Sequence, residues 1–252
     1  MKPRVGIFGL TGCAGDQLLI LNCEDELLDL VQLVDFRDFT MAASSPDVDC
    51  TLDIAFVEGA VVTAEDEHLL RRTRDRARLL VAIGTCAIWG GVPGIPTTRP
   101  REELLHAVYG ETATQWEVGR VRALREVVPV DAEISGCPIE KTEFLAALSS
   151  LLQGNLPALP RYAVCTECRI RENRCVLVSD GVLCCGPLTL AGCDARCPAV
   201  GVACIGCRGP APDANVDSAT RLFESKGYTH DDIARRLQVF APMPATAGRT
   251  HA

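Results

Sequence analysis

The sequence has few lysines, no long hydrophobic run and little positive charge. Only Lys2, Lys141 and Lys226 stand among its 25 basic residues, which we take as a bias of composition rather than a sign of function. The net charge of −8 and the pI near 5.1 argue against a nucleic-acid surface and against affinity for anionic lipid. No apolar run is long enough to span a bilayer, and the first residues, "MKPRVGIFGL", lack the layout of a signal peptide. We therefore expect a cytoplasmic protein with no membrane span and no nucleic-acid partner.

Cysteine is abundant, with 14 copies. A reducing compartment rarely holds so many thiols unless a soft metal binds them. Five lie in the first 160 residues and nine lie between residues 165 and 207. This distribution predicts a body over residues 1–160, a cysteine-dense module over 161–210 and a tail over 211–252. In the tail, "THDDIARRL" (229–237) predicts a helix that begins with a capping box.

Short apolar runs alternate with amphipathic segments in the body. The runs predict strands at residues 5–10, 30–36, 52–57, 78–83 and 129–135. Helical spacing of apolar residues predicts helices at residues 16–31, 63–79, 100–110 and 139–152. This alternation predicts an α/β fold, an open parallel sheet with helices on both faces. In such sheets, ligands bind outside the carboxyl ends of the strands.

The loops that leave these strands carry side chains that bind metals. The loops after the first, fourth and last strands read "TGCAGD", "GTCAIWGGVPG" and "SGCPIE", and they contain Cys13, Asp16, Cys86 and Cys137. Because parallel strands end at one rim, we expect these side chains to converge there. Three thiols and one carboxylate fit a four-coordinate iron–sulfur cluster, and the flanking glycines let the backbone approach it closely.

Isolated cysteines are also common in protein cores. Cys23, on a predicted helix, and Cys50, before a predicted strand, fit that alternative. The three thiols of the rim fit it poorly, because each follows a strand inside a glycine or proline turn. Glu58, in "VEGAV" after the third strand, lies at the same rim. We expect it near the metal but not as a ligand; the alternative is a helix cap or a hydrogen-bond partner of nearby backbone.

The remaining nine cysteines are concentrated in "VCTECRIRENRCVLVSDGVLCCGPLTLAGCDARCPAVGVACIGCRGP". They are Cys165, Cys168, Cys175, Cys184, Cys185, Cys193, Cys197, Cys204 and Cys207. Two C-x-x-C pairs flank a Cys-x-x-x-Cys-Pro element, which is typical of the end of bacterial ferredoxin motifs. Two four-iron clusters need eight thiolates, so one thiol is spare. The order of the thiols along the chain does not say which cluster each one binds.

Zinc is the alternative for the C-x-x-C pairs. Two zinc sites would explain neither the Cys-Pro element nor the thiols of the body, and a disulfide framework fits neither a cytoplasmic chain nor an odd count. None of the four histidines lies in the module; they are His68, His106, His230 and His251.

The motifs "LTGCAGD", "VEGAV", "GTCAIWGGVPG" and "GCPI", in this order, resemble the small subunit of nickel–iron hydrogenases, a relative of a subunit of respiratory complex I. The resemblance extends to about residue 210. It implies a flavodoxin-like domain with a C-terminal ferredoxin-like two-cluster module. It also implies that a proximal cluster bound by Cys13, Cys86 and Cys137 lies beside the nickel–iron site of a separate large subunit. Asp16 takes the position of the family's fourth cysteine.

That aspartate departs from the commoner C-x-G-C pattern and resembles cytoplasmic hydrogenases that couple to soluble coenzymes. A carboxylate has the same formal charge as a thiolate but is a harder donor, so as a ligand it would tune the cluster's potential. The alternative is a helix N-cap beside a water-ligated iron. In "CCGP", the resemblance aligns Cys184 as the ligand and leaves Cys185 to packing. Exported hydrogenases use a histidine at their distal cluster, and its absence here favours the cytoplasmic group.

The resemblance implies an oxidoreductase subunit with no catalytic residue of its own. It would carry three [4Fe–4S] clusters and relay electrons from the H₂-activating large subunit to an iron–sulfur or flavin partner. We expect the acceptor to be NAD(P), reduced by a separate flavoprotein. The alternatives are a deazaflavin-reducing or heterodisulfide-reductase-coupled hydrogenase and a free-standing ferredoxin-like carrier.

Overall fold

The computed structural model describes residues 2–44, 47–95, 100–115 and 119–243. Its centre is a five-stranded parallel sheet in the order β2-β1-β3-β4-β5. The strands are β1 (Arg4–Gly9), β2 (Asp35–Phe39), β3 (Leu52–Glu58), β4 (Ala77–Ile83) and β5 (Ala132–Ile134). This is the order of flavodoxin-like sheets, and it confirms the predicted α/β fold. The central strands are apolar along most of their length because both faces of the sheet are covered.

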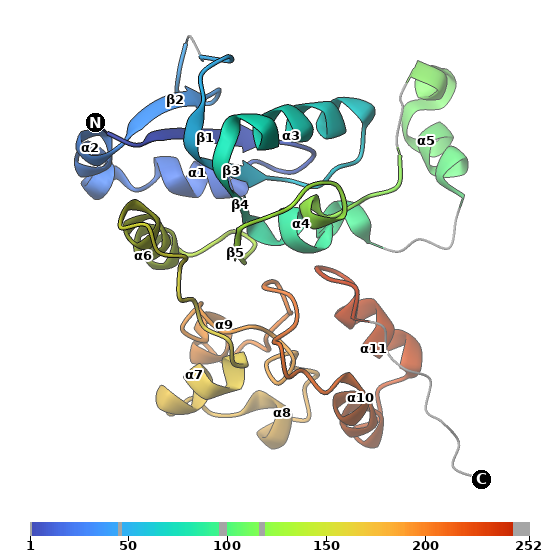
Figure 1. Cartoon of the computed structure of the whole chain (residues 1–252). Helices are drawn as coiled ribbons and strands as arrows, with labels where there is room; N and C mark the ends of the chain where they lie inside the picture. Colours follow the sequence, from blue (N-terminus) through green and yellow to red (C-terminus); the bar gives the residue numbers. More distant parts are fainter. Residues whose placement is uncertain (1, 45–46, 96–99, 116–118, 244–252) are drawn as a thin grey trace.

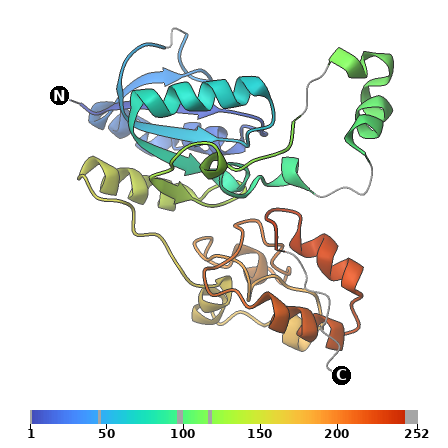
Figure 2. The ribbon, with the colours of Figure 1, turned by 45° about the vertical axis from the view of Figure 1, so that its right-hand side comes forward.

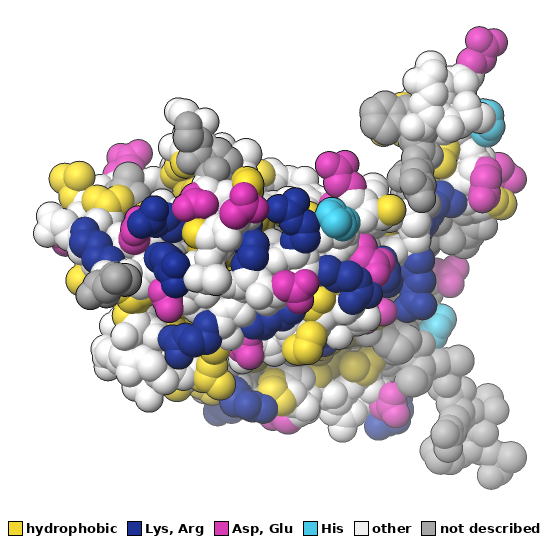
Figure 3. Space-filling view, turned by 45° about the horizontal axis from the view of Figure 1, so that its top comes forward, with side chains coloured by type: hydrophobic (Ala, Val, Ile, Leu, Met, Phe, Trp, Pro, Cys, Tyr) yellow, Lys and Arg dark blue, Asp and Glu magenta, His cyan; other side chains and the backbone are white. Residues whose placement is uncertain are grey.

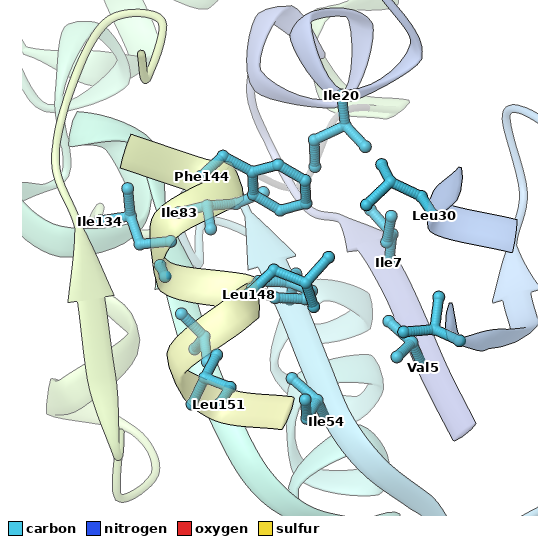
Figure 4. Packing of buried hydrophobic residues seen from close by; sticks show 14 of the residues in the cluster. Val5, Ile7, Ile20, Leu30, Ile54, Ile83, Ile134, Phe144, Leu148 and Leu151 are labelled. Atoms are coloured by element: carbon cyan, nitrogen blue, oxygen red, sulfur yellow. The ribbon is translucent and has the colours of Figure 1, made fainter. Parts of the chain in front are cut away.

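Helices cover both faces of the sheet (Figure 1). One face carries α1 (Gly15–Leu21), α2 (Glu24–Leu33) and α6 (Lys141–Leu152), and the other carries α3 (Ala64–Arg76) and α4 (Gly84–Trp89). Phe144 and Leu148 of α6 pack against the sheet beside Ile7 and Ile54 (Figure 4). The hydrophobic core therefore has two halves, and the ends of the strands remain free to form a site.

Two boundaries in the first third of the chain differ from the prediction. The helix predicted over 16–31 is interrupted before α2, where the fully buried Cys23 is at the N-cap position. The strand predicted over 30–36 is wrong in its bounds, because residues 30–33 complete α2 and β2 begins at Asp35. The segment "LLDLVQLVDF" has apolar residues at both helical and strand spacing, and packing of Leu30 in the core favours the helix.

Other elements lie close to their predicted positions. Thr63 caps α3 in a capping box with Asp66, and α3 runs directly into β4, three residues before the predicted helix end. The last strand is shorter than predicted. The helix predicted over 100–110 is α5 (Arg101–Tyr109), which stands apart from the sheet (Figure 2). Three short 3₁₀ helices complete this part: η1 (Val92–Gly94), η2 (Gly110–Gln115) and η3 (Leu124–Glu126).

The cysteine-dense segment and the tail pack as a second unit on the side of α4 and β5 (Figures 1 and 2). Their helices are α7 (Val164–Ile170), α8 (Val176–Ser179), α9 (Arg196–Ala199), α10 (Val216–Ser225) and α11 (His230–Leu237). The predicted tail helix is confirmed as α11, with the Thr229 hydroxyl accepting from the backbone N–H of Asp232. Strand pairing in the described part of this unit consists of isolated bridges, so its likeness to ferredoxin, like the three domain boundaries, stays a prediction.

Acidic and basic side chains are interspersed over the face that Figure 3 presents. Within the described ranges, we find no helix with the length and apolar character that a membrane span needs.

Candidate metal centres

The first centre lies at the carboxyl ends of the strands. Cys13 follows β1, Cys86 lies in α4 directly after β4, and Cys137 follows β5. The pKa of the Cys86 and Cys137 thiols is raised to about 11, mainly by burial and in smaller part by negative charge on Asp16 and Cys13. The structure thus brings together the four side chains that the sequence placed at one rim.

Asp16 points across the centre rather than along its own helix. Its Oδ1 accepts a hydrogen bond of 2.7 Å from the backbone N–H of Ile139, two residues after Cys137. The side chain is buried, and this burial raises the pKa of the Asp16 carboxyl to about 7, against the lowering effect of that hydrogen bond. The N-cap residue of α1 is Ala14, with no side-chain cap, so the N-cap alternative for Asp16 is wrong.

The carboxylate of Asp16 fits only because residue 84 is glycine. Gly84 has a φ of +80°, which L side chains rarely adopt, and a Cβ there would collide with Oδ2 of Asp16. The sequence signal for this glycine is the Gly-Thr-Cys turn that directly follows a buried strand, although its contact with Asp16 is visible only in the fold.

Glu58 holds the start of α1. Its side chain is 3% exposed, and its two carboxylate oxygens accept hydrogen bonds from the backbone N–H groups of Gln17, at 3.0 Å, and Asp16, at 3.4 Å. These are among the N–H groups that a helix leaves without internal partners. Glu58 is therefore a hydrogen-bond partner of nearby backbone, and it lies close enough for its charge to raise the pKa of the Cys86 thiol, after the larger effect of burial.

The second centre is a cavity in the C-terminal unit. Its lining is apolar apart from Arg174 and four thiols, those of Cys165, Cys168, Cys175 and Cys184. The pKa of the Cys165 thiol is raised to about 11, mainly by burial and in smaller part by the charges of the other three thiols. The structure therefore places these four thiols together. Their order along the chain did not predict which thiols share a site.

A third group lies between these two centres. The pKa of the Cys207 thiol is raised to about 11, mainly by burial and in smaller part by charge on Cys193, Cys137 and Cys197. The Cys207 thiol therefore lies near two thiols of the cysteine-dense segment and near Cys137 of the first centre. Cys204 is buried beside Cys184: its backbone N–H donates to the Cys184 sulfur at 3.3 Å, and burial raises the pKa of its thiol.

Cys185 lies outside the four-thiol cavity. Its side chain has no exposed surface and belongs to the hydrophobic core of the C-terminal unit. Burial raises the pKa of this thiol to about 12. Cys23 is likewise fully buried in the sheet domain, and Cys50 is half-buried beside Arg76. These positions agree with packing roles for all three.

Short hydrogen bonds tie the first centre to the third. The Thr85 hydroxyl lies 2.9 Å from the carbonyl oxygen of Gly136 and 2.5 Å from that of Cys207. The Ser135 hydroxyl donates to the carbonyl oxygen of Arg208. Neither hydroxyl carried a signal in the sequence, because their acceptors lie on segments that only the fold brings together.

The donor sets, soft thiolates with one carboxylate at the rim, suit iron–sulfur clusters. A structural zinc site gathers four ligands around a single ion. A cluster instead gives each ligand an iron of its own. All the cysteines are free thiols, and within each group their anionic forms raise each other's pKa values, so cations are needed to hold them together as thiolates.

Comparisons with known proteins agree with this arrangement. A family model described as "NADH ubiquinone oxidoreductase, 20 Kd subunit" matches residues 13–151. Sulfhydrogenase 2 subunit delta of Pyrococcus furiosus is 37% identical over 94% of this chain and 99% of its own. A subunit of the F420-non-reducing hydrogenase of Methanocaldococcus jannaschii is 33% identical, covering 83% of this chain and 82% of that one. A solved chain of an NAD⁺-reducing [NiFe]-hydrogenase is 30% identical with a TM-score of 0.57, covering 64% of this chain and 96% of that chain.

Proposed function

Because this chain belongs to the family of the 20 kDa subunit of NADH ubiquinone oxidoreductase, in which its relatives are hydrogenase subunits, we propose that it is the electron-transfer small subunit of a nickel–iron hydrogenase. One observation supports this more than any other. Cys13, Asp16, Cys86 and Cys137 converge at the sheet rim, inside the segment that the family model matches. H₂ would be activated on a separate large subunit.

We assign three [4Fe–4S] clusters to the chain. The rim group would hold the proximal cluster, and the cavity of Cys165, Cys168, Cys175 and Cys184 would hold a second. The remaining thiols, Cys193, Cys197, Cys204 and Cys207, would hold the third. When bound, such clusters accept and release single electrons. The chain's own residues supply the thiolates and the Asp16 carboxylate and fix the loops through Thr85 and Ser135, while the Cys13 and Cys175 thiols are exposed.

The position of Cys207 suggests the order of the relay. Its thiol lies near Cys137 on one side, whereas Cys204 of the same group lies near Cys184 on the other. Electrons would therefore pass from the rim group through the Cys193–Cys207 group to the cavity group. Cys175 is an exposed thiol of that last group, so a partner would accept electrons on this side.

The partners would be a nickel–iron large subunit, an iron–sulfur subunit and a flavoprotein that reduces NAD(P) in the cytoplasm. Coupling to a different acceptor is a second candidate. The NAD⁺-reducing relative matches only 64% of this chain, although that covers 96% of the relative, whereas the F420-non-reducing relative matches 83% of this chain. The additional C-terminal thiols favour a partner that takes electrons from that unit.

Anaerobic co-purification tests the proposal. A tagged chain from its native host should bring down a nickel-containing subunit in equal amount, and the complex should take up H₂. The Cys86→Ala variant should lose H₂-dependent reduction of a dye because the rim group loses a ligand. The matched Cys23→Ala variant removes a core thiol and should keep the activity. A stable monomer without nickel would refute the hydrogenase assignment and favour a free-standing carrier; the flavin content and the acceptor reduced by the complex separate the two couplings.

A further inference from the structure

A buried ion pair joins the two units of the chain. Nη2 of Arg208 lies 2.6 Å from Oε2 of Glu143, and the two side chains are 2% and 8% exposed. Arg208 directly follows Cys207, whereas Glu143 lies in the first turn of α6, after the Cys137 loop. Nε of Arg208 also donates to the carbonyl oxygen of Ala191, at 2.9 Å. The pair therefore lies beside the third thiol group, on the side that faces the rim.

The pair is enclosed but not fully satisfied. Nη1 of Arg208 and Oε1 of Glu143 are buried without a hydrogen-bond partner among the described residues. Gly192, with a φ of +120°, packs directly on the pair, and a Cβ at this position would collide with both carboxylate and guanidinium. Solvent is thus excluded by backbone, and the charges remain largely unscreened.

Stability alone gives no reason to keep such a pair. Removing two charges from water is costly, and apolar side chains of similar volume often replace a buried ion pair without loss of stability. An incompletely hydrogen-bonded pair is a still weaker source of stability. A role for the charge itself accounts for the presence of the pair.

The positive charge of Arg208 acts on the third thiol group. Arg208 directly follows Cys207, its Nε bonds the carbonyl oxygen of Ala191 at 2.9 Å, and the pair packs against Gly192, which directly precedes Cys193. A fixed cation therefore stabilises negative charge at this group. Each electron that arrives adds one negative charge to the group that accepts it and removes one from the group that donates it, with no bond made or broken.

We propose that the buried Arg208–Glu143 pair sets the reduction potential of the centre formed by Cys193, Cys197, Cys204 and Cys207. This inference rests on the proposed function, because it requires a cluster at these thiols. Arg208 raises the potential by stabilising the reduced state, and Glu143 offsets part of that increase. Arg208 is an electrostatic residue that need not touch a ligand, and its effect depends on burial.

Redox titration of the whole purified complex, followed by electron paramagnetic resonance, tests this proposal. The signal of the third centre is the one that Cys193→Ser removes. Arg208→Gln should lower the ratio of reduced to oxidised centre at the parent's midpoint potential by about tenfold or more, which is about 59 mV for one electron. Glu143→Gln should shift the same signal in the opposite direction, and Arg208→Lys should restore most of the parent value.

Two further variants keep the test decisive. Arg208→Gln combined with Glu143→Gln leaves no unpaired charge and should lower the potential by less than Arg208→Gln alone, so it remains informative if a single variant does not fold. Arg196→Gln is the matched control: Arg196 lies next to Cys197 but is 74% exposed, so solvent screening should leave the potential nearly unchanged. Iron content should be constant across these charge variants.

Shifts in one direction for both single variants, or an unchanged potential in the double variant, would overturn the inference. A parent complex with no signal that depends on Cys193 would instead refute the cluster assignment on which the inference rests.

Discussion

Cys184 and Cys185 are neighbours in the chain, yet the structure predicts opposite results for their removal. Cys184 lines the four-thiol cavity, whereas Cys185 is fully buried in the core outside it. We expect Cys184→Ala to lose about four of the roughly twelve irons that three clusters contain, and Cys185→Ala to keep all of them. The two substitutions delete the same atom from adjacent positions, so each is a control for the other.

The size of the stability effect at Cys185 follows from its burial. Removing a methylene-sized group from a core costs about 1 kcal/mol in transfer free energy, and the remaining cavity adds to this, for about 1–2 kcal/mol in total. In a protein of this size, that lowers the apparent melting temperature by roughly 2–8 °C. Alanine is preferable to serine here, because a buried hydroxyl without a partner would cost about 1–3 kcal/mol more.

Iron analysis and thermal melting on anaerobically purified protein measure both effects. The expected result is a fully loaded Cys185→Ala protein that melts slightly earlier, and a Cys184→Ala protein that lacks one cluster signal. Loss of iron from the Cys185 variant, with full loading of the Cys184 variant, would reverse the assignment and refute the reasoning from burial.

Three further results are expected. Metal analysis of native protein should give about twelve irons per chain and no zinc, and stoichiometric zinc or only about four irons would contradict the three-cluster assignment. Asp16→Cys should keep a four-iron proximal cluster with a shifted potential, whereas Asp16→Ala and Asp16→Asn should give a three-iron or water-ligated centre. The Asn side chain can still accept a hydrogen bond from Ile139, so an unchanged signal in that variant would show that Asp16 is not a ligand. Gly84→Ala should displace the Asp16 carboxylate and reproduce the spectrum of Asp16→Ala, while a spectrum identical to that of the parent would show that the rim tolerates a Cβ there.

The sequence predicted the sheet and the convergence at its rim because both follow from local patterns. Apolar runs such as 52–57 are short but clear, and a glycine turn after the first, third, fourth and last runs marks where the chain leaves the sheet. The error at residues 30–36 arose where one segment satisfied both spacings and only packing of Leu30 decided between them.

The contacts of the site side chains were beyond the reach of sequence patterns. The carboxylate of Asp16 is held by Ile139, and Glu143 pairs with Arg208, partners that lie far apart in the chain. Such pairs depend on how distant segments of the chain pack together in the fold, and no periodicity in the sequence predicts that. The grouping of Cys165 with Cys184 likewise needed the fold.

The distribution of the rim side chains along the chain has a consequence for biogenesis. The loops of Cys13, Cys86 and Cys137 meet only after β1, β3, β4 and β5 have paired in that order, so this centre is absent from a growing or partly folded chain. The thiols of the second unit all lie between Cys165 and Cys207, where loop closure is short and metal can drive local folding. We therefore expect iron to enter the C-terminal unit during folding and the rim last, when the sheet, with its slower long-range pairings, is complete. A maturation factor that loads the rim would have to recognise the finished sheet rather than an unfolded segment.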